Sequence, residues 1–181
     1  MRVLIACAVL LIVACQAPAP PTPTPTQAVP TVAPTPAPPA ASASRVDALN
    51  AANAAFARGD LTTASGLFDR VVNTPPTGEP PATAPVLTSY AHFRAMVALL
   101  AAGRDDDARV HLEALQQADA SGSLTRLAAQ LWDQYGMVGQ LRGACAQLQP
   151  QISSQASATL STLQSAGVTV DAASLCSVPS A

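Results

Sequence analysis

The chain contains no lysine, so all nine of its basic residues are arginines, and 11 acidic residues outnumber them. Charged residues make up 11% of the 181 residues, and aromatic residues only 3%. The absence of a basic patch excludes the electrostatic surface that nucleic-acid-binding proteins need. Because aromatic residues are scarce while alanine is abundant, the composition favours closely packed helices over a strand-rich core. We therefore expect an all-α domain with no nucleic-acid partner.

Catalytic and metal-binding motifs are missing as well. The sequence has no phosphate-cradling glycine loop, no G-x-S-x-G, no H-E-x-x-H and no C-x-x-C pair. The run 105–107 is acidic but lacks the alternating ligands and later glutamate of a calcium loop, so we interpret it as negative charge at a helix N-terminus. His92 and His111 have no cysteine near them in the sequence, and we expect both to be partly exposed surface residues. These absences predict no enzyme, no metal site and no cofactor.

The N-terminus has the pattern of an export signal. Arg2 precedes an apolar run of 12 residues, 3–14, whose last member is the small residue Ala14. A positive start, a short apolar core and a small final residue are typical of a secretory signal peptide. Twelve helical residues rise about 18 Å, well short of the ~30 Å hydrocarbon core of a bilayer. We therefore predict a signal peptide over residues 1–14.

The residue after this run is a cysteine, and the stretch Leu-Ile-Val-Ala-Cys at 11–15 resembles the lipobox of bacterial lipoproteins. The resemblance implies cleavage before Cys15 and a lipid thioether on Cys15. It also implies export and anchoring to the outer face of a bacterial membrane in the cell envelope. A similar motif ends at Cys7, but cleavage there would leave almost no apolar core. The alternative is an ordinary signal peptide followed by an incidental cysteine.

Residues 15–42 predict a stalk. From 16 to 42 the chain is almost wholly proline, alanine, threonine and serine, with 10 of the protein's 17 prolines and no charge. Proline cannot donate a backbone hydrogen bond, and apolar periodicity is absent, so we expect disorder. In an extended polyproline conformation these residues would reach roughly 80 Å. An O-glycosylated segment and a proline-rich ligand for aromatic grooves are the alternatives.

Residues 43–167 have apolar residues at helical spacing, and they predict a domain of six or seven helices. Ser44 and Asp60 are suitable N-caps, while Gly59 and Gly103 are suitable helix ends. A tail over 168–181 follows the domain and carries a turn capped by Asp171. The expected helices run from 44 to 58, from 60 to 73, from 86 to 102, from 104 or 105 to the turn at 121–123, from there to Gly136, from Gly136 to 149, and from 150 to 167.

An internal repeat appears around the first two glycine turns. Each turn follows one helix and precedes another, and the second helix carries an alanine four residues before a large apolar residue. This pattern resembles the tetratricopeptide repeat, whose unit is a helical hairpin. The resemblance implies antiparallel hairpins stacked in a right-handed array, with a third unit turning at Gly136. The positions that carry the pattern are Gly59, Ala64, Phe68, Gly103, Ala108 and Leu112.

The same resemblance implies a function in protein binding. Asn53, Tyr90 and Arg94 occupy first-helix positions that line the inner face of tetratricopeptide domains, although the lysines of the family's carboxylate clamp are missing. We therefore expect a membrane-anchored scaffold that binds a protein partner in the cell envelope. The alternative function is a non-catalytic structural or solute-capturing helical bundle without a groove. An open inner face would favour the first function, and a filled face the second.

Two cysteines remain once Cys7 leaves with the signal peptide and Cys15 carries the lipid. Thiols in an oxidising compartment usually pair, so we predict a disulfide between Cys145 and Cys176. Such a bond would pin the tail to the sixth helix and cover the end of the repeat. Two unpaired buried cysteines are the alternative.

Overall fold

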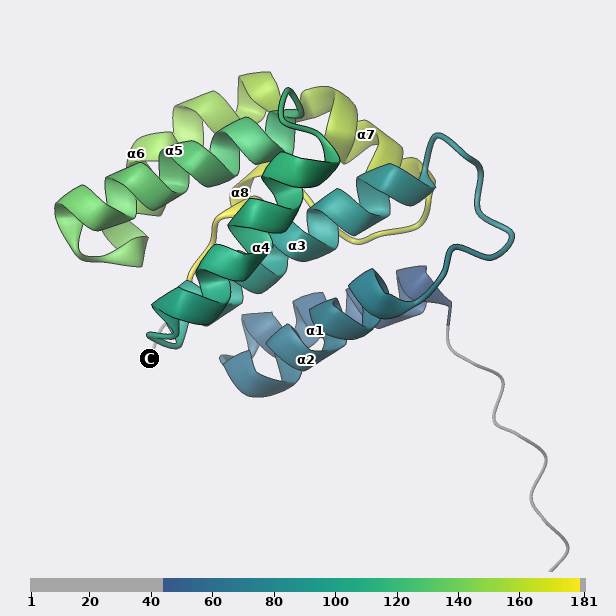
Figure 1. The fold of residues 1–181 in the computed structure, drawn as a ribbon, viewed down its shortest axis with the longest axis horizontal. Helices are drawn as coiled ribbons and strands as arrows, with labels where there is room; N and C mark the ends of the chain where they lie inside the picture. Colours follow the sequence, from purple (N-terminus) through teal and green to yellow (C-terminus); the bar gives the residue numbers. More distant parts are fainter. Residues whose placement is uncertain (1–43, 180–181) are drawn as a thin grey trace, which may run out of the picture. The chain divides into compact units, whose positions relative to one another are not determined.

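A computed structural model describes residues 44–179 of the chain (Figure 1). This range contains eight α-helices and no strand, which confirms the all-α prediction. The predicted signal peptide, Cys15 and the Pro-rich stretch lie outside the described residues. None of the helices within 44–179 combines the length and the apolar character that a membrane span requires. The helices are α1 Arg45–Ala57, α2 Leu61–Asn73, α3 Ala84–Ala101, α4 Asp105–Ala118, α5 Ser123–Val138, α6 Leu141–Gln155, α7 Ser157–Ser165 and α8 Ala172–Leu175.

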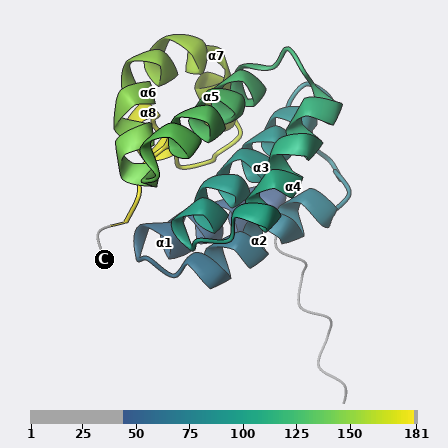
Figure 2. The same ribbon diagram turned by 60° about the vertical axis from the view of Figure 1, so that its left-hand side comes forward.

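The helices pack in sequential pairs. α1 packs on α2, α3 on α4, and α5 on α6, so the pairs follow one another along the chain (Figures 1 and 2). α3 is the central helix, because it contacts α1, α2, α4, α5 and α7. Its long buried stretch, from Tyr90 to Leu100 with only His92 partly exposed, belongs to one core shared by all the pairs.

Local sequence signals set the ends of the first helices. Ser44 caps α1 in a reciprocal capping box with Asp47, and Asp60 caps α2 by accepting the Thr63 N–H at 3.1 Å. Gly59 and Gly103 have φ angles of +79° and +70°, a conformation that favours glycine. In both turns the residue after the glycine donates its N–H to the carbonyl five residues earlier, as in a Schellman motif.

The structure corrects the predicted boundaries in the second half. Gly136 does not break α5, which continues to Val138 and ends at Gly139, where φ is +68°. Gly136 has an ordinary helical conformation, whereas a left-handed residue at Gly139 lets its N–H bond the Tyr135 carbonyl at 2.8 Å. The predicted third turn therefore lies three residues later in the chain.

Pro150 does not open a seventh helix but lies inside α6. Proline there removes the N–H that would bond the carbonyl of Ala146. Both residues are on the exposed side of α6, so water can bind that carbonyl instead. The predicted turn at Asp171 is a one-turn helix, α8, which raises the number of helices in the described range from the expected six or seven to eight.

Arg45 fastens the first pair to the loop of residues 74–83. Its side chain is 3% exposed, and its Nη1 lies 2.8 Å from a carboxylate oxygen of Glu79 in that loop. Its Nε donates to the Val71 carbonyl at 3.2 Å, and its Nη2 donates to the Thr88 hydroxyl on α3. One guanidinium therefore joins the start of α1, the end of α2, the loop and α3.

His92 on α3 and His111 on α4 are partly exposed, as predicted, and they also form a pair that the sequence does not predict. Their Nδ1 atoms lie 3.0 Å apart, so one must donate a proton to the other's lone pair. His111 Nε2 lies 3.2 Å from a carboxylate oxygen of Asp69 on α2. The carboxylate favours a proton on that Nε2, and neutral His111 then accepts the N–H of His92.

This arrangement disfavours protonation of the pair. The pKa of His92 is lowered to about 4, chiefly by burial and also by the neighbouring His111, while Asp69 opposes the shift. Burial also lowers the pKa of His111, against the attraction of Asp69 and Asp107. Two protonated rings could not keep the hydrogen bond between their Nδ1 atoms.

The buried alanines of the repeat generate a first prediction. Ala64 and Ala108 are both 0% exposed, and Phe68 is also fully buried. We expect Ala64→Leu to overpack the contacts of α2 and to lower the free energy of unfolding by roughly 1–3 kcal/mol. Ala54→Leu, on the exposed side of α1, is the matched control and should change it little. Equal stability of the two variants in urea denaturation would contradict the packing assigned to Ala64.

The histidine pair generates a second prediction. Because both folded pKa values lie below the ordinary 6.5, the unfolded chain binds protons first as the pH falls. The contribution of the neutral pair to the free energy of unfolding is therefore fully present above pH 6.5, and it is lost as the pH falls from 6.5 toward 4. We expect a loss of roughly 1–2 kcal/mol after screening of these partly exposed rings is allowed for. The unfolding free energy should be measured by urea titration at several pH values. In the double variant His92→Asn/His111→Asn this pH dependence should be lost. If the variant keeps the same change of unfolding free energy with pH, the histidine pair is not its cause.

Candidate functional site

The candidate site is the side of α1 and α3 that carries Asn50, Asn53, Tyr90 and Arg94, which we call the inner face. The C-terminal segment, residues 167–179, lies against this face. It leaves α7 at Gly167, where φ is +91°, runs in an extended conformation to Asp171, forms α8 and continues to Pro179. Figure 1 shows this yellow segment among helices that precede it by many residues in the sequence.

Two asparagines on α1 bind the backbone of the extended part. Asn50 donates through Nδ2 to the Gly167 carbonyl at 3.0 Å and accepts the Thr169 N–H at 2.7 Å. Asn53, one helical turn later, donates to the Thr169 carbonyl at 3.2 Å. Residues three apart lie on one face of a helix, so the two asparagines together bind the backbone from Gly167 to Thr169.

Tyr90 fixes the orientation of Asn53. Its hydroxyl donates to Asn53 Oδ1 at 2.9 Å, which leaves the amide nitrogen of Asn53 directed at the tail. Tyr90 is 1% exposed, and burial raises the pKa of its hydroxyl. The hydroxyl therefore stays protonated and remains a donor at neutral pH.

Arg94 binds the end of α8. Its Nη1 donates to the carbonyls of Ser174 and Leu175, at 2.8 and 2.9 Å. Both belong to the last turn of α8, where carbonyls lack the usual i+4 partners and carry partial negative charge. The Ser174 carbonyl also accepts the N–H and the hydroxyl of Ser177. The guanidinium carbon lies 4.2 Å from the ring centroid of Phe56 and 5.9 Å from that of Phe68, within range of cation–π attraction.

Arg94 is a buried cation that forms no ion pair with any described carboxylate. Its exposure is 3%, and its Nε has no hydrogen-bond partner among the described residues. Burial lowers the pKa of the guanidinium, but arginine starts so high that the charge is retained. The tail carbonyls and the two aromatic rings therefore supply the compensation that a carboxylate would otherwise give.

Side chains outside the inner face complete the binding of the tail. Gln164 on α7 donates to the Val170 carbonyl at 2.8 Å, and Gln149 on α6 donates to the Ala172 carbonyl at 3.0 Å. Val168 and Val170 are 2% and 8% exposed, whereas the intervening Thr169 is exposed. This alternation is that of an extended strand with one buried side.

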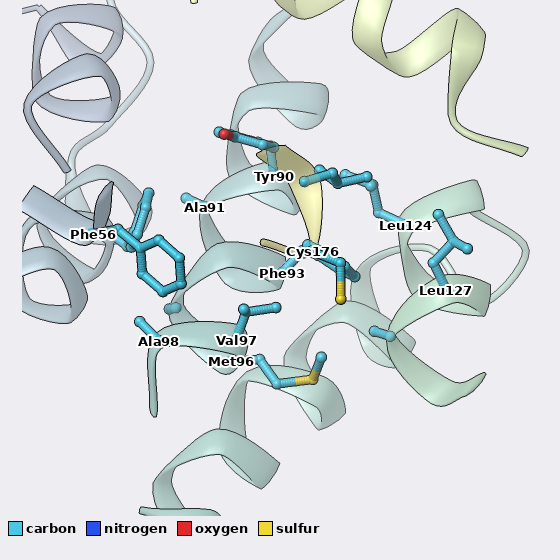
Figure 3. Packing of buried hydrophobic residues seen from close by; sticks show 14 of the residues in the cluster. Phe56, Tyr90, Ala91, Phe93, Met96, Val97, Ala98, Leu124, Leu127 and Cys176 are labelled. Carbon is cyan, nitrogen blue, oxygen red and sulfur yellow. The ribbon is translucent and has the colours of Figure 1, made fainter. Parts of the chain in front are cut away.

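The predicted disulfide is present and closes the far end of the segment. Cys145 on α6 is bonded to Cys176, directly after α8, with a Cα–Cα distance of 5.4 Å. The two cysteines are only 4% and 3% exposed. Cys176 belongs to the same buried cluster as Phe56 of α1, Phe93 of α3 and Leu127 of α5, some of which Figure 3 shows.

The structure thus brings Asn53, Tyr90 and Arg94 together on one face, and the chain's own tail covers that face. Sequence reasoning missed Asn50, Gln149 and Gln164. The spacing of Asn50 and Asn53 on one helical face was a usable signal, because an amide can read both backbone N–H and carbonyl groups. The two glutamines gave no such signal, since the tail they bind could not be placed from the sequence.

Two cavities lie away from the inner face. One, of about 320 Å³, lies beside the N-terminal part of α3 and is lined by Pro85, Val86 and Leu124. The other, of about 540 Å³, lies where the 74–83 loop meets α7 and includes the paired Glu79. Neither cavity is lined by a histidine or a cysteine, and residues 44–179 hold no group of three or more side chains suited to a metal ion.

Comparison with known proteins adds no relative: no protein-family model, no curated protein and no solved structure matches the chain. The described residues form an all-helical domain whose helices pack in sequential pairs.

Proposed function

We propose that the protein is an exported, lipid-anchored scaffold whose helical pairs form a tetratricopeptide-like array that binds a protein partner. The observation that carries this proposal is the way the inner face holds an extended segment, by side-chain hydrogen bonds to its backbone. Such contacts depend little on the bound sequence. An inner face of this kind is therefore suited to extended segments of other polypeptides.

Spacing of the turns supports a repeat array. Gly59 and Gly103 are 44 residues apart, and Gly103 and Gly139 are 36 apart, against 34 in the tetratricopeptide repeat. The longer first interval contains the 74–83 loop, which Arg45 fastens through Glu79. Without that loop the first interval would approach the second, so we assign α1–α2, α3–α4 and α5–α6 as three units of a right-handed array.

Location is the second part of the proposal. A buried disulfide is a feature of proteins that fold in oxidising compartments outside the cytoplasm. The lipobox-like sequence ending at Cys15 would hold the protein at a membrane, and the Pro-rich stretch would let the domain work at a distance of up to roughly 80 Å from it. The partner would then belong to the cell envelope.

A second candidate function is a closed structural or solute-capturing bundle. The observation that favours it is the filled inner face: the tail covers Asn53, Tyr90 and Arg94, and a buried disulfide holds the tail there. In that case the tail is a cap for the last pair, whose outer side has no further repeat to cover it. The two candidates differ in whether the inner face ever meets another protein.

Anchoring generates a third prediction. We expect Cys15→Ser to prevent incorporation of radiolabelled palmitate and to leave the protein uncleaved or soluble, because the thiol that would carry the lipid is gone. The matched control is Cys7→Ser, which alters the other cysteine of the leader and should be labelled like the unaltered protein. Labelling of the Cys15→Ser protein at the ordinary level would remove the lipoprotein assignment.

Partner binding generates a fourth prediction. After crosslinking in intact membranes, the unaltered protein and its Cys145→Ser/Cys176→Ser variant should each be purified and their crosslinked partners compared. We expect a partner whose yield falls when Asn50 and Asn53 are both changed to alanine. Arg109→Ala, on the exposed side of α4, should leave the yield unchanged. If neither form yields a partner that depends on these asparagines, the closed-bundle function is the better one.

A further inference from the structure

The C-terminal segment is held to the domain in the way a bound peptide is held. Side chains of α1, α3, α6 and α7 hydrogen-bond its carbonyls, and branched side chains at alternate positions fill apolar sites. Leu175, which follows in α8, is fully buried. The carbonyls bound in this way are those of Gly167, Thr169, Val170, Ala172, Ser174 and Leu175.

Removing this segment would expose a cation and apolar side chains that another segment could cover. Arg94 would lose both carbonyl partners and keep only the rings of Phe56 and Phe68. The sites of Val168, Val170 and Leu175 would be uncovered as an apolar trough. A second segment with the same pattern would satisfy both the cation and the trough.

One covalent bond decides whether such an exchange can occur. In the disulfide form the segment is tied at both ends, by the chain at Gly167 and by Cys176 bonded to Cys145. Both sulfur-bearing residues are buried, so an external thiolate cannot reach the bond while the segment is in place. In the dithiol form only non-covalent contacts hold the segment, and it can leave the inner face.

We propose that residues 167–177 are an internal ligand, and that the dithiol form accepts an external segment in their place until the Cys145–Cys176 bond closes the face. The proposal rests on the inner face being the binding face of the proposed function. The external segment is an extended peptide with branched apolar residues at alternate positions, followed by a helical turn whose last carbonyls reach Arg94. Closure transfers two electrons and two protons from the thiols of Cys145 and Cys176 to a disulfide oxidant, which becomes a dithiol.

Closure is therefore a one-way step. The newly exported chain arrives with Cys145 and Cys176 as thiols and with an exchangeable segment, and the bond that forms on oxidation in the envelope compartment is buried. A partner must reach the inner face before oxidation, or be excluded afterwards. A tail that only caps the last helical pair and a tail that is an internal ligand differ in one observable property. Only the internal ligand can be replaced by an external peptide of the same pattern.

The test is disulfide trapping of a synthetic peptide. The full chain carrying Cys176→Ser keeps a single thiol, Cys145, among the described residues. It is incubated in a glutathione redox buffer with a peptide of residues 166–179, whose Cys176 is retained. The control peptide has the same composition and the same cysteine position, with Val168, Val170 and Leu175 exchanged for polar residues of the peptide. We expect the native-pattern peptide to form the mixed disulfide with Cys145 at least about tenfold faster than the control.

Protein controls identify the face. Asn50→Ala, added to the Cys176→Ser chain, should reduce the preference for the native-pattern peptide, whereas Asn73→Ala, an exposed asparagine at the end of α2, should not. If the Cys176→Ser chain does not fold by circular dichroism, the unaltered chain is reduced and then reoxidised with excess peptide. Partition into the mixed disulfide is then compared for the two peptides.

Equal trapping of the two peptides, in either format, would overturn the internal-ligand assignment. That result would leave the proposed function intact if membrane crosslinking still yielded a partner that depends on Asn50 and Asn53. If trapping is selective but crosslinking yields no such partner, the internal-ligand assignment stands and the proposed function fails. The inner face then binds segments of this pattern, but no envelope protein binds there.

Discussion

The buried guanidinium of Arg94 is the interaction on which the arrangement of this domain depends. It lies where α1, α2, α3 and α8 meet, with the ring of Phe56 on α1 and that of Phe68 on α2 within cation–π range. A charge removed from water costs several kcal/mol unless partners replace the lost hydration. Here the replacements are two carbonyls at the end of α8, and hydrogen bonds to charged groups contribute about 1.5–3 kcal/mol each. The tail therefore stabilises the first two helical pairs, because its two carbonyls replace part of the hydration that the Arg94 guanidinium has lost.

The disulfide and Arg94 act on the same segment by different physical means. Arg94 binds α8 directly and with a geometry that any helical C-terminus can supply. Cys145 and Cys176 are 31 residues apart in the sequence. In the chain-entropy description, a bond that closes a loop of this size lowers the entropy of the unfolded chain and so stabilises the folded state by about 3–4 kcal/mol. The non-covalent contacts thus specify where the segment lies, while the covalent bond makes its position permanent. In the proposed exchange, this division lets an exchangeable dithiol form precede the closed disulfide form.

Local signals in the sequence predicted the first half of the fold well. Ser44, Gly59, Asp60 and Gly103 each act within one helical turn, so their roles do not depend on distant residues. The rules failed at Pro150, because the buried Leu148 and Ile152 keep α6 helical on both sides of a residue of low helix propensity. They also failed at Gly136, where α5 continues through an exposed turn and ends at the left-handed Gly139 instead. The pairing of His92 with His111 and the contact of Arg94 with α8 could not be predicted, because both depend on which helix faces unite segments far apart in the chain.

The tail of the chain lies against the face that carries the candidate site residues. The resemblance to tetratricopeptide domains predicts Asn53, Tyr90 and Arg94 on an inner face; Asn53 and Arg94 bind the backbone of the chain's own tail, and Tyr90 orients Asn53. Amides and a guanidinium that bind backbone groups discriminate little between extended segments, so in the proposed exchange selectivity would come from the buried sites of Val168, Val170 and Leu175. The affinity of an intramolecular segment is amplified by its high effective concentration, and an external segment can win only when it binds more tightly or arrives first. In the proposed exchange, oxidation ends that competition, so the timing of disulfide formation as well as the shape of the face would determine which segment is bound.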